Sequence, residues 1–329
     1  MKRSIAVLLL LACSLPTLAA KVPYTYYRVG SPSDVSTPTS AGTVLMGGGE
    51  DVAAAFQWLC ARSGGGDFLV IRVTGTDAYN PWVQDLCPGV NSVATLIIPT
   101  SDAANDPAVK AYIDAAEILW IAGGDQSNYI NYWQGTPVQA AVNASIQRGV
   151  PVGGTSAGMN VLTQFVYSAL ASKGVTSSQA LADPFNRYMS FARDFLNVPG
   201  LQATIADPHF VTRDRMGREI AFLCRQYAYG WAASPRAIAV DEATALLVEP
   251  NGGVSVVGTG TAYFLSAAAP PAVCQPKTPL TYENVDVYRI GPQSGSFDLV
   301  KWSGRGGTGY KVSATAGVIT STQADGSPY

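Results

Sequence analysis

Short apolar runs alternate with longer amphipathic segments along the first half of the chain. The apolar runs, which predict strands, lie at residues 42–46, 67–73, 93–99 and 118–122. Apolar residues recur at helical spacing in the segments between them, at residues 51–61, 102–116 and 128–148. The predicted strands are almost wholly apolar, as in a parallel sheet that helices cover on both faces. The alternation therefore predicts an α/β fold with a doubly wound, mostly parallel sheet.

A fifth predicted strand, residues 150–154, leads directly into Thr155-Ser156-Ala157-Gly158, and a helical pattern resumes over residues 159–171. A Gly-x-Ser-x-Gly sequence between a strand and a helix is typical of a nucleophile elbow, a sharp turn that exposes a serine. Gly154 and Gly158 permit this turn because they carry no Cβ. Small residues also meet at turns for packing alone. The position between a strand and a helix favours the nucleophile.

The second half of the chain is less regular and richer in predicted strands. After residue 172 an apolar run covers residues 201–206, and a helical pattern covers residues 212–227. Short strands are predicted at residues 237–241, 245–249, 254–257, 261–265 and 285–290. We expect one domain over residues 21–313, with extra C-terminal β-strands, and a peripheral tail over residues 314–329.

Composition excludes some classes of function. The chain has 329 residues, of which 47% are hydrophobic, so it can bury a large core. Only 13% of the residues are charged, the formal net charge is −2, and no basic run occurs. This balance gives no support for nucleic-acid binding.

The N-terminus resembles an export signal. Lys2 and Arg3 precede an apolar stretch at residues 5–12, and small residues at 17–20 follow as a cleavage region. The apolar stretch is too short to cross a bilayer as a helix. We therefore expect a signal peptide over residues 1–20 and a secreted or periplasmic bacterial protein. The alternative is a lipoprotein, because Leu10-Leu11-Ala12-Cys13 resembles a lipoprotein cleavage site that would leave a lipid anchor on Cys13.

Cysteine and histidine usage bears on the compartment and on metals. Four cysteines remain after export, and an even number permits two disulfides in an oxidising compartment. Sequence order suggests Cys60–Cys87 and Cys224–Cys274, but three pairings exist, and four unpaired thiols are the alternative. The chain has no CxxC pair and one histidine, so we expect no metal site and no cofactor.

The single histidine, His209, is the only imidazole that could activate Ser156. A serine hydroxyl attacks a carbonyl well only when a base takes its proton, and that base is usually an imidazole held by a carboxylate. Asp241 and Glu242 are both candidates for the carboxylate. Neighbouring residues in a strand face opposite sides, so only one of them can point at the site.

The chain order of these residues discriminates between folds. In α/β-hydrolases the nucleophile is followed by the acid and then by the histidine. Here the order is serine, histidine, acid, which argues against that fold unless Asp183, Asp194 or Asp207 supplies the acid.

Five segments carry a resemblance to a known family. They are residues 47–49 (GGG), 123–126 (GGDQ), 153–158 (GGTSAG), 207–218 (DPHFVTRDRMGR) and 239–245 (AVDEATA). Together they resemble the cyanophycinase and peptidase E family, the serine relatives of the class I glutamine amidotransferases. The last two segments are much more specific than the elbow. The resemblance implies a flavodoxin-like serine peptidase.

The resemblance also implies roles for individual residues. Ser156 would be the nucleophile, His209 the base and Glu242 the acid that orients it. Backbone N–H groups near Gly124 and Ala157 would form the oxyanion hole. The family's substrate-site positions fall on Gln126, Asp207, Arg213, Arg215 and Arg218. Without a substrate role, the arginines would form a solvated helix face on which Asp214 and Arg218 make an i,i+4 pair.

The implied substrate is cyanophycin, a poly-aspartate backbone with arginine on each side-chain carboxyl, which is cut to β-aspartyl-arginine dipeptides. The alternatives are an aspartyl dipeptidase like peptidase E and a non-enzymatic binding module on the same fold. The family has glutamine immediately before the histidine, whereas this chain has Pro208. Either that glutamine is dispensable or the substrate differs. A homodimer is left open.

Overall fold

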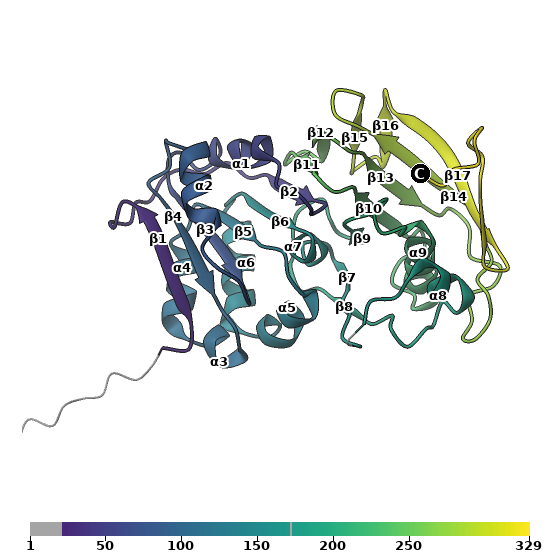
Figure 1. Cartoon of the computed structure of the whole chain (residues 1–329), viewed down its shortest axis with the longest axis horizontal. Helices are drawn as coiled ribbons and strands as arrows, with labels where there is room; N and C mark the ends of the chain where they lie inside the picture. The colour runs from purple at the N-terminus through teal and green to yellow at the C-terminus, as the bar shows by residue number, and fades with distance from the viewer. Residues whose placement is uncertain (1–21, 172) are drawn as a thin grey trace, which may run out of the picture.

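The computed structural model describes residues 22–171 and 173–329, so the expected signal peptide and Cys13 lie outside the described residues. The described residues form two sheets, of ten and eight strands, which lie next to each other with helices packed against both (Figure 1). In this part of the chain, no helix is both long enough and apolar enough to cross a membrane.

The first sheet contains the five predicted parallel strands. They are β2 (Thr43–Met46), β3 (Asp67–Arg72), β4 (Ser92–Ile97), β5 (Ile118–Ile121) and β6 (Val152–Thr155). They are ordered β4-β3-β5-β6-β2, and every neighbouring pair in this series is parallel. An antiparallel strand that the sequence pattern did not predict, β1 (Thr25–Gly30), pairs with β4 at one edge. At the other edge the sheet continues antiparallel through β11 (Thr244–Val248), β12 (Gly253–Gly258), β15 (Ser296–Asp298) and β16 (Ser303–Arg305).

Helices cover both faces of this parallel core, which confirms the doubly wound α/β fold (Figure 1). One apolar cluster joins the sheet to α1 (Ala53–Cys60) and α2 (Tyr79–Leu86). The other joins it to α3 (Ser101–Ala104), α4 (Pro107–Asp114), α5 (Gln126–Trp133) and α6 (Pro137–Gln147). Two predicted helices are each divided in two, because Pro107 and Pro137 begin new helices at positions where the missing N–H costs nothing.

The helix predicted over residues 159–171 was wrong. The helix after the elbow, α7 (Ala157–Asn160), has four residues and is followed by the strand β7 (Phe165–Tyr167). Residues 161–167 are rich in β-branched and aromatic side chains, which favour strands. All three side chains of β7 are buried, and the strand pairs with β8 (Phe191–Arg193) and β9 (Thr204–Asp207). Tertiary pairing therefore overrides the helical spacing.

The second sheet is assembled from the later strands. Its order is β18-β17-β14-β13-β10-β9-β7-β8, and α8 (Ser177–Ala182) and α9 (Met216–Ala228) pack against it. Its remaining strands are β10 (Arg236–Val240), β13 (Ala262–Ser266), β14 (Tyr282–Ile290), β17 (Thr308–Thr315) and β18 (Val318–Ser321). Residues 314–329, expected to be peripheral, complete this sheet, because β18 pairs with β17 and Ala314 is buried. The single domain over residues 21–313 stays a prediction.

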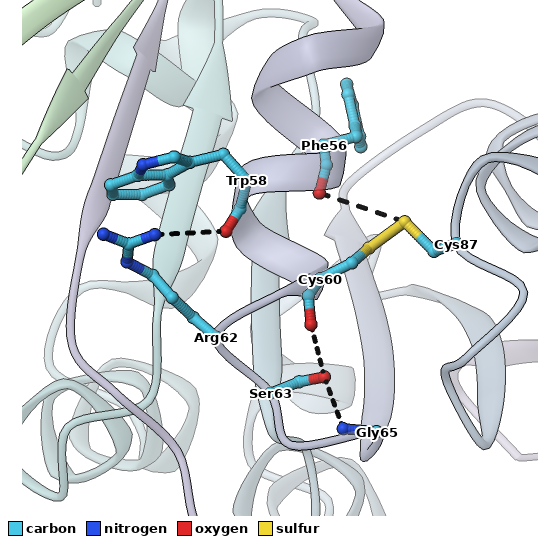
Figure 2. The surroundings of a disulfide bond; sticks show 7 residues. All are labelled: Phe56, Trp58, Cys60, Arg62, Ser63, Gly65 and Cys87. Atoms are coloured by element: carbon cyan, nitrogen blue, oxygen red, sulfur yellow. Dashed lines mark hydrogen bonds between the residues drawn. A yellow bond between two sulfur atoms is a disulfide. The ribbon is translucent and has the colours of Figure 1, made fainter.

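Two disulfides join the cysteines in the pairs that sequence order suggests. Cys60 at the end of α1 is bonded to Cys87, which follows α2. In the turn between α1 and β3, the Ser63 hydroxyl donates to the carbonyl of Cys60 and accepts from the N–H of Gly65 (Figure 2). Cys224 in α9 is bonded to Cys274 in the proline-rich loop. The bonds close segments of 27 and 50 residues, which reduces the conformational freedom of the unfolded chain.

Candidate active site

Ser156 lies on a strained turn between β6 and α7. Its backbone has φ 54° and ψ −115°, a conformation that non-glycine residues rarely adopt and that is typical of a nucleophile elbow. The flanking glycines make the turn possible. A Cβ on Gly154 would lie 2.6 Å from the carbonyl of Gly158, and one on Gly158 would collide with the carbonyl of Ile121 in β5.

His209 and Glu242 complete a hydrogen-bonded chain with this serine. Ser156 Oγ lies 2.7 Å from His209 Nε2, and His209 Nδ1 lies 2.5 Å from Glu242 Oε1. His209 follows β9 with φ 50° and is only 6% exposed. Glu242 lies in the turn between β10 and β11. The three residues come from three distant segments of the chain.

The carboxyl end of β2 holds all three segments through its backbone. The Ser156 N–H donates to the carbonyl of Met46 at 3.0 Å, and the His209 N–H donates to the carbonyl of Gly47 at 2.7 Å. The N–H of Ala243, next to Glu242, donates to the carbonyl of Gly48 at 2.8 Å. These carbonyls fix the spacing between the segments that carry the three side chains.

The glycine run at residues 47–49 leaves the space that two of these side chains occupy. A Cβ on Gly48 would collide with the imidazole of His209. A Cβ on Gly49 would lie 2.9 Å from Glu242 Cβ. The run of glycines is therefore explained by the space that His209 and Glu242 require, which could not be seen from the sequence alone.

The electrostatic environment suits a neutral imidazole beside an ionised carboxylate. Burial lowers the pKa of His209, outweighing the hydrogen bond to Glu242, which raises it. The hydrogen bond from His209 lowers the pKa of Glu242. A neutral imidazole that donates from Nδ1 presents a free lone pair on Nε2 to the serine hydroxyl, which is the arrangement general-base chemistry requires.

Asp241, the other candidate acid, points elsewhere. Its carboxylate accepts from the N–H of Val211 at 3.2 Å, and from the N–H and hydroxyl of Thr261 at 3.0 and 2.6 Å. Asp241 thus connects the segment after His209 to Thr261, the residue before β13, while Glu242 faces the imidazole.

Asp207 and Arg218 are buried in an ion pair, which argues against the direct substrate contact expected for them. Asp207 is 0% and Arg218 4% exposed, and Arg218 Nε donates to Asp207 Oδ2 at 2.7 Å. The expected Asp214–Arg218 pair is absent from the described residues, because Arg218 turns to Asp207 instead. Burial raises the pKa of the neighbouring Glu219 well above its usual value, and the charge of Asp207 adds to this effect.

Arg215 belongs to the same buried cluster. It donates to Asp207 Oδ1 at 2.9 Å and to the carbonyl of Pro208 at 2.6 Å. The cluster therefore holds the peptide that immediately precedes His209, and Arg215 supports the site rather than facing it.

Arg213 and Gln126 are the remaining candidates for substrate contact. Arg213 is exposed, and it makes no ion pair within the described residues. Its charge contributes to the lowered pKa of His209, after burial, and of Glu242, after the hydrogen bond. Gln126, at the start of α5, is half-buried and donates to the carbonyl of Tyr167 at 3.3 Å.

The expected oxyanion donors lie close to the serine. Ala157 follows Ser156 directly, and a Cβ on Gly123 would lie 3.5 Å from Ser156 Cβ, so the turn containing Gly124 borders the nucleophile. The backbone N–H groups of Gly124 and Ala157 have no hydrogen-bond partner among the described residues. No group of three or more potential metal-ligating side chains occurs in the described part of the chain.

The model of peptidase family S51 matches residues 89–251, a range that contains Ser156, His209 and Glu242. The chain belongs to peptidase family S51. Three of the five segments that resembled this family in the sequence carry the serine, the histidine and the acid, and all three lie within the matched range.

Two curated relatives of this S51 member are named cyanophycinase. The cyanophycinase of Nostoc sp. (strain PCC 7120 / SAG 25.82 / UTEX 2576) is 27% identical over 207 residues, which cover 61% of this chain. That match spans 63% of the Nostoc protein, less than two thirds of its length. The cyanophycinase of Geminocystis herdmanii (strain PCC 6308) is 23% identical over 269 residues, covering 76% of this chain and 91% of the relative.

A solved structure shows the same fold. The crystal structure of a peptidase from an acI-B1 Actinobacterium superposes with a TM-score of 0.53 at 16% identity. The superposition covers 79% of this chain and 98% of that one.

Proposed function

We propose that this S51 member is a serine exopeptidase that hydrolyses cyanophycin to β-aspartyl-arginine dipeptides. The observation that carries the proposal is the hydrogen-bonded chain from Ser156 through His209 to Glu242, built on a strained elbow. The curated relatives named cyanophycinase supply the substrate class.

In this reaction Ser156 Oγ attacks the scissile carbonyl while its proton passes to His209 Nε2. Glu242 orients the imidazole and stabilises the imidazolium that forms. The N–H groups of Gly124 and Ala157 donate hydrogen bonds to the oxyanion of the tetrahedral intermediate and stabilise its negative charge. The imidazolium then gives its proton to the leaving amine. Water, activated by the same imidazole, finally hydrolyses the acyl-enzyme and restores the serine.

Arg213 is proposed to bind a carboxylate of the substrate. It is the exposed guanidinium whose charge reaches the imidazole and Glu242, whereas Arg215 and Arg218 are engaged with Asp207. A guanidinium binds a carboxylate through two parallel hydrogen bonds, and cyanophycin offers a carboxylate on each arginine. Gln126 is proposed to contact the same substrate by its amide.

We also propose that the protein is exported. Its two disulfides suit an oxidising compartment, and residues 1–20 have the pattern of a signal peptide. Secretion or periplasmic location is the expected outcome, with a lipid anchor at Cys13 as the alternative. The mass of the mature protein recovered from its host distinguishes the two.

The decisive experiment compares the native protein with Ser156→Ala. Both are treated with a fluorophosphonate and with cyanophycin and a panel of α- and β-aspartyl dipeptides. We expect labelling of Ser156 and release of β-aspartyl-arginine by the native protein only, with turnover lower by a thousandfold or more, on the order of other triad deletions, in the variant.

The other outcomes are equally informative. Cleavage of α-aspartyl dipeptides without cleavage of cyanophycin would assign an activity like that of peptidase E. Binding of cyanophycin without cleavage or labelling would assign a binding module. Near-normal turnover by Ser156→Ala would exclude the serine mechanism.

A further inference from the structure

Tyr329 folds back onto the segment that follows His209. Its hydroxyl accepts a hydrogen bond from the N–H of Met216 at 3.0 Å and donates one to Asp214 Oδ1 at 2.7 Å. Burial raises the pKa of Tyr329, so the hydroxyl stays protonated and keeps the donor that Asp214 needs. Tyr329 lies outside residues 89–251, the range that the S51 model matches.

Packing and further hydrogen bonds hold Tyr329 in this place. Its ring centroid lies 5.5 Å from that of Phe210, the buried residue next to His209. The hydroxyl of Tyr310 in β17 donates to the carbonyl of Pro328 at 2.9 Å, and Gln323 donates to the carbonyl of Tyr329 at 2.8 Å. The contact thus rests on the second sheet.

The turn that Tyr329 contacts carries Arg213. The N–H of Arg213 donates to the carbonyl of His209 at 3.1 Å, and the next residue, Asp214, has φ 47°. Asp214 therefore sits in the left-handed region, where a non-glycine residue needs support. Its backbone carbonyl accepts from the Ser177 hydroxyl, and its carboxylate accepts from Tyr329.

Asp214 and Arg213 are adjacent in sequence and opposite in charge. A carboxylate bound to the tyrosine hydroxyl is directed to the second sheet, which leaves the exposed guanidinium of Arg213 without an internal partner in the described residues. If the tyrosine hydroxyl were missing, the carboxylate of Asp214, one residue away in the chain, would be free to pair with Arg213.

We propose that Tyr329 is a positioning residue for substrate recognition: it holds the carboxylate of Asp214 away from Arg213, so that Arg213 remains available to a substrate carboxylate. The inference rests on the proposed function, in which Arg213 binds that carboxylate. The carbonyl of Gly47 and the carboxylate of Glu242 hold His209 separately, so we expect the chemistry at Ser156 to depend little on the Tyr329 hydroxyl.

The test compares Tyr329→Phe with a matched control, Tyr288→Phe. Tyr288 also accepts a backbone N–H, from Gly307 at 2.9 Å, but it lies on β14 away from Ser156. We expect Tyr329→Phe to raise KM for an aspartyl-arginine substrate by about threefold to tenfold, the value of one ordinary hydrogen bond. The kcat and the rate of Ser156 labelling by a small neutral fluorophosphonate should stay within about twofold, because transition-state contacts are retained.

A rescue variant separates this role from simple structural support. Asp214→Asn removes the charge that would compete for Arg213, so Asp214→Asn/Tyr329→Phe should recover most of the native KM. A general loosening of the turn would leave the double variant as weak as Tyr329→Phe. Melting temperatures of all variants show whether each is folded.

Three results overturn the inference. They are a KM for Tyr329→Phe equal to that of Tyr288→Phe, a labelling rate that falls together with 1/KM, and a double variant without rescue. In each case the native enzyme is active, so the proposed function survives. A native protein that neither cleaves the substrate nor reacts with the fluorophosphonate overturns the proposed function, and this inference with it.

Discussion

Ser156 and His209 both have positive φ, but the molecule holds them in different ways. Ser156 lies in a strained turn that is formed by neighbouring residues: the strand β6 before it, the helix α7 after it, and the two glycines Gly154 and Gly158. His209 depends on Gly47 and Gly48 from the first sheet, on Glu242 between the sheets, and on the buried Asp207 behind it. Apart from the hydrogen bond from Ser156 to Met46 and the packing of Gly158 on Ile121, the nucleophile is therefore positioned by its local turn, whereas the base is positioned by long-range contacts.

This difference has a physical consequence. A turn formed by adjacent residues loses little conformational entropy when it closes, whereas a base held by distant segments requires the whole fold to be formed. We expect substitutions on the base side to separate into those that affect chemistry, those that displace the imidazole, and those that destabilise the protein.

The largest effect is expected for Glu242→Gln. The amide cannot stabilise the imidazolium, so kcat should fall by about a thousandfold or more while the fold is retained. Asp241→Asn is the matched control, because Asp241 binds Val211 and Thr261 rather than the imidazole. It should lower the melting temperature, because these hydrogen bonds are lost, and it should lower kcat much less than Glu242→Gln does. Equal losses of kcat in the two variants would contradict the assignment of the acid.

Gly48→Ala tests the steric part of the comparison. Gly48 has φ 90°, and its added Cβ would collide with the imidazole of His209. Gly135→Ala is the control, because Gly135 has φ 75° but nothing within 4 Å of an added Cβ. Both should lose about 1–2 kcal/mol of stability from the left-handed backbone. Only Gly48→Ala should also lower kcat/KM, by about a hundredfold, as expected for a displaced catalytic group.

Arg218→Met tests the buried support behind His209. The substitution removes one of the two arginines that neutralise Asp207, which is 0% exposed. We expect a loss of about 3–5 kcal/mol in the free energy of unfolding, as for other broken buried pairs. Lys110→Met breaks the exposed i,i+4 pair with Asp114 and should cost less than about 0.5 kcal/mol. Denaturant titration of both variants measures the difference. A small loss for Arg218→Met would mean that the cluster does not support the base.

The smallest effect is expected in the pH profile. Burial lowers the pKa of His209 below its ordinary value of 6.5, so kcat/KM should persist to lower pH than for an exposed histidine. The positive charge of Arg213 disfavours the protonated imidazole. Arg213→Ala should therefore raise this pKa, and activity should begin to fall at a higher pH. The shift should shrink at high salt, and an unchanged acid limb would show that Arg213 lies too far from the base.

Much of the first sheet and of the nucleophile could be predicted from the sequence. The five parallel strands are nearly continuous apolar runs, and the elbow contains its strand, glycines and serine within residues 150–158. The helix predicted after the elbow failed at β7, where Phe165 pairs with Ile205, forty residues away. Local spacing contains no information about such a partner.

The sequence by itself determined the α/β class, the nucleophilic turn, the single histidine and the family to which the chain belongs. The family resemblance implied Glu242 as the acid, and the tertiary structure places its carboxylate rather than that of Asp241 against the imidazole. Only the tertiary structure decided that Arg215 and Arg218 bind Asp207 and that Tyr329 reaches Asp214. The first group depends on residue types and spacings within one segment. The second depends on which distant side chains come into contact, and that is set by the packing of two sheets rather than by any local pattern.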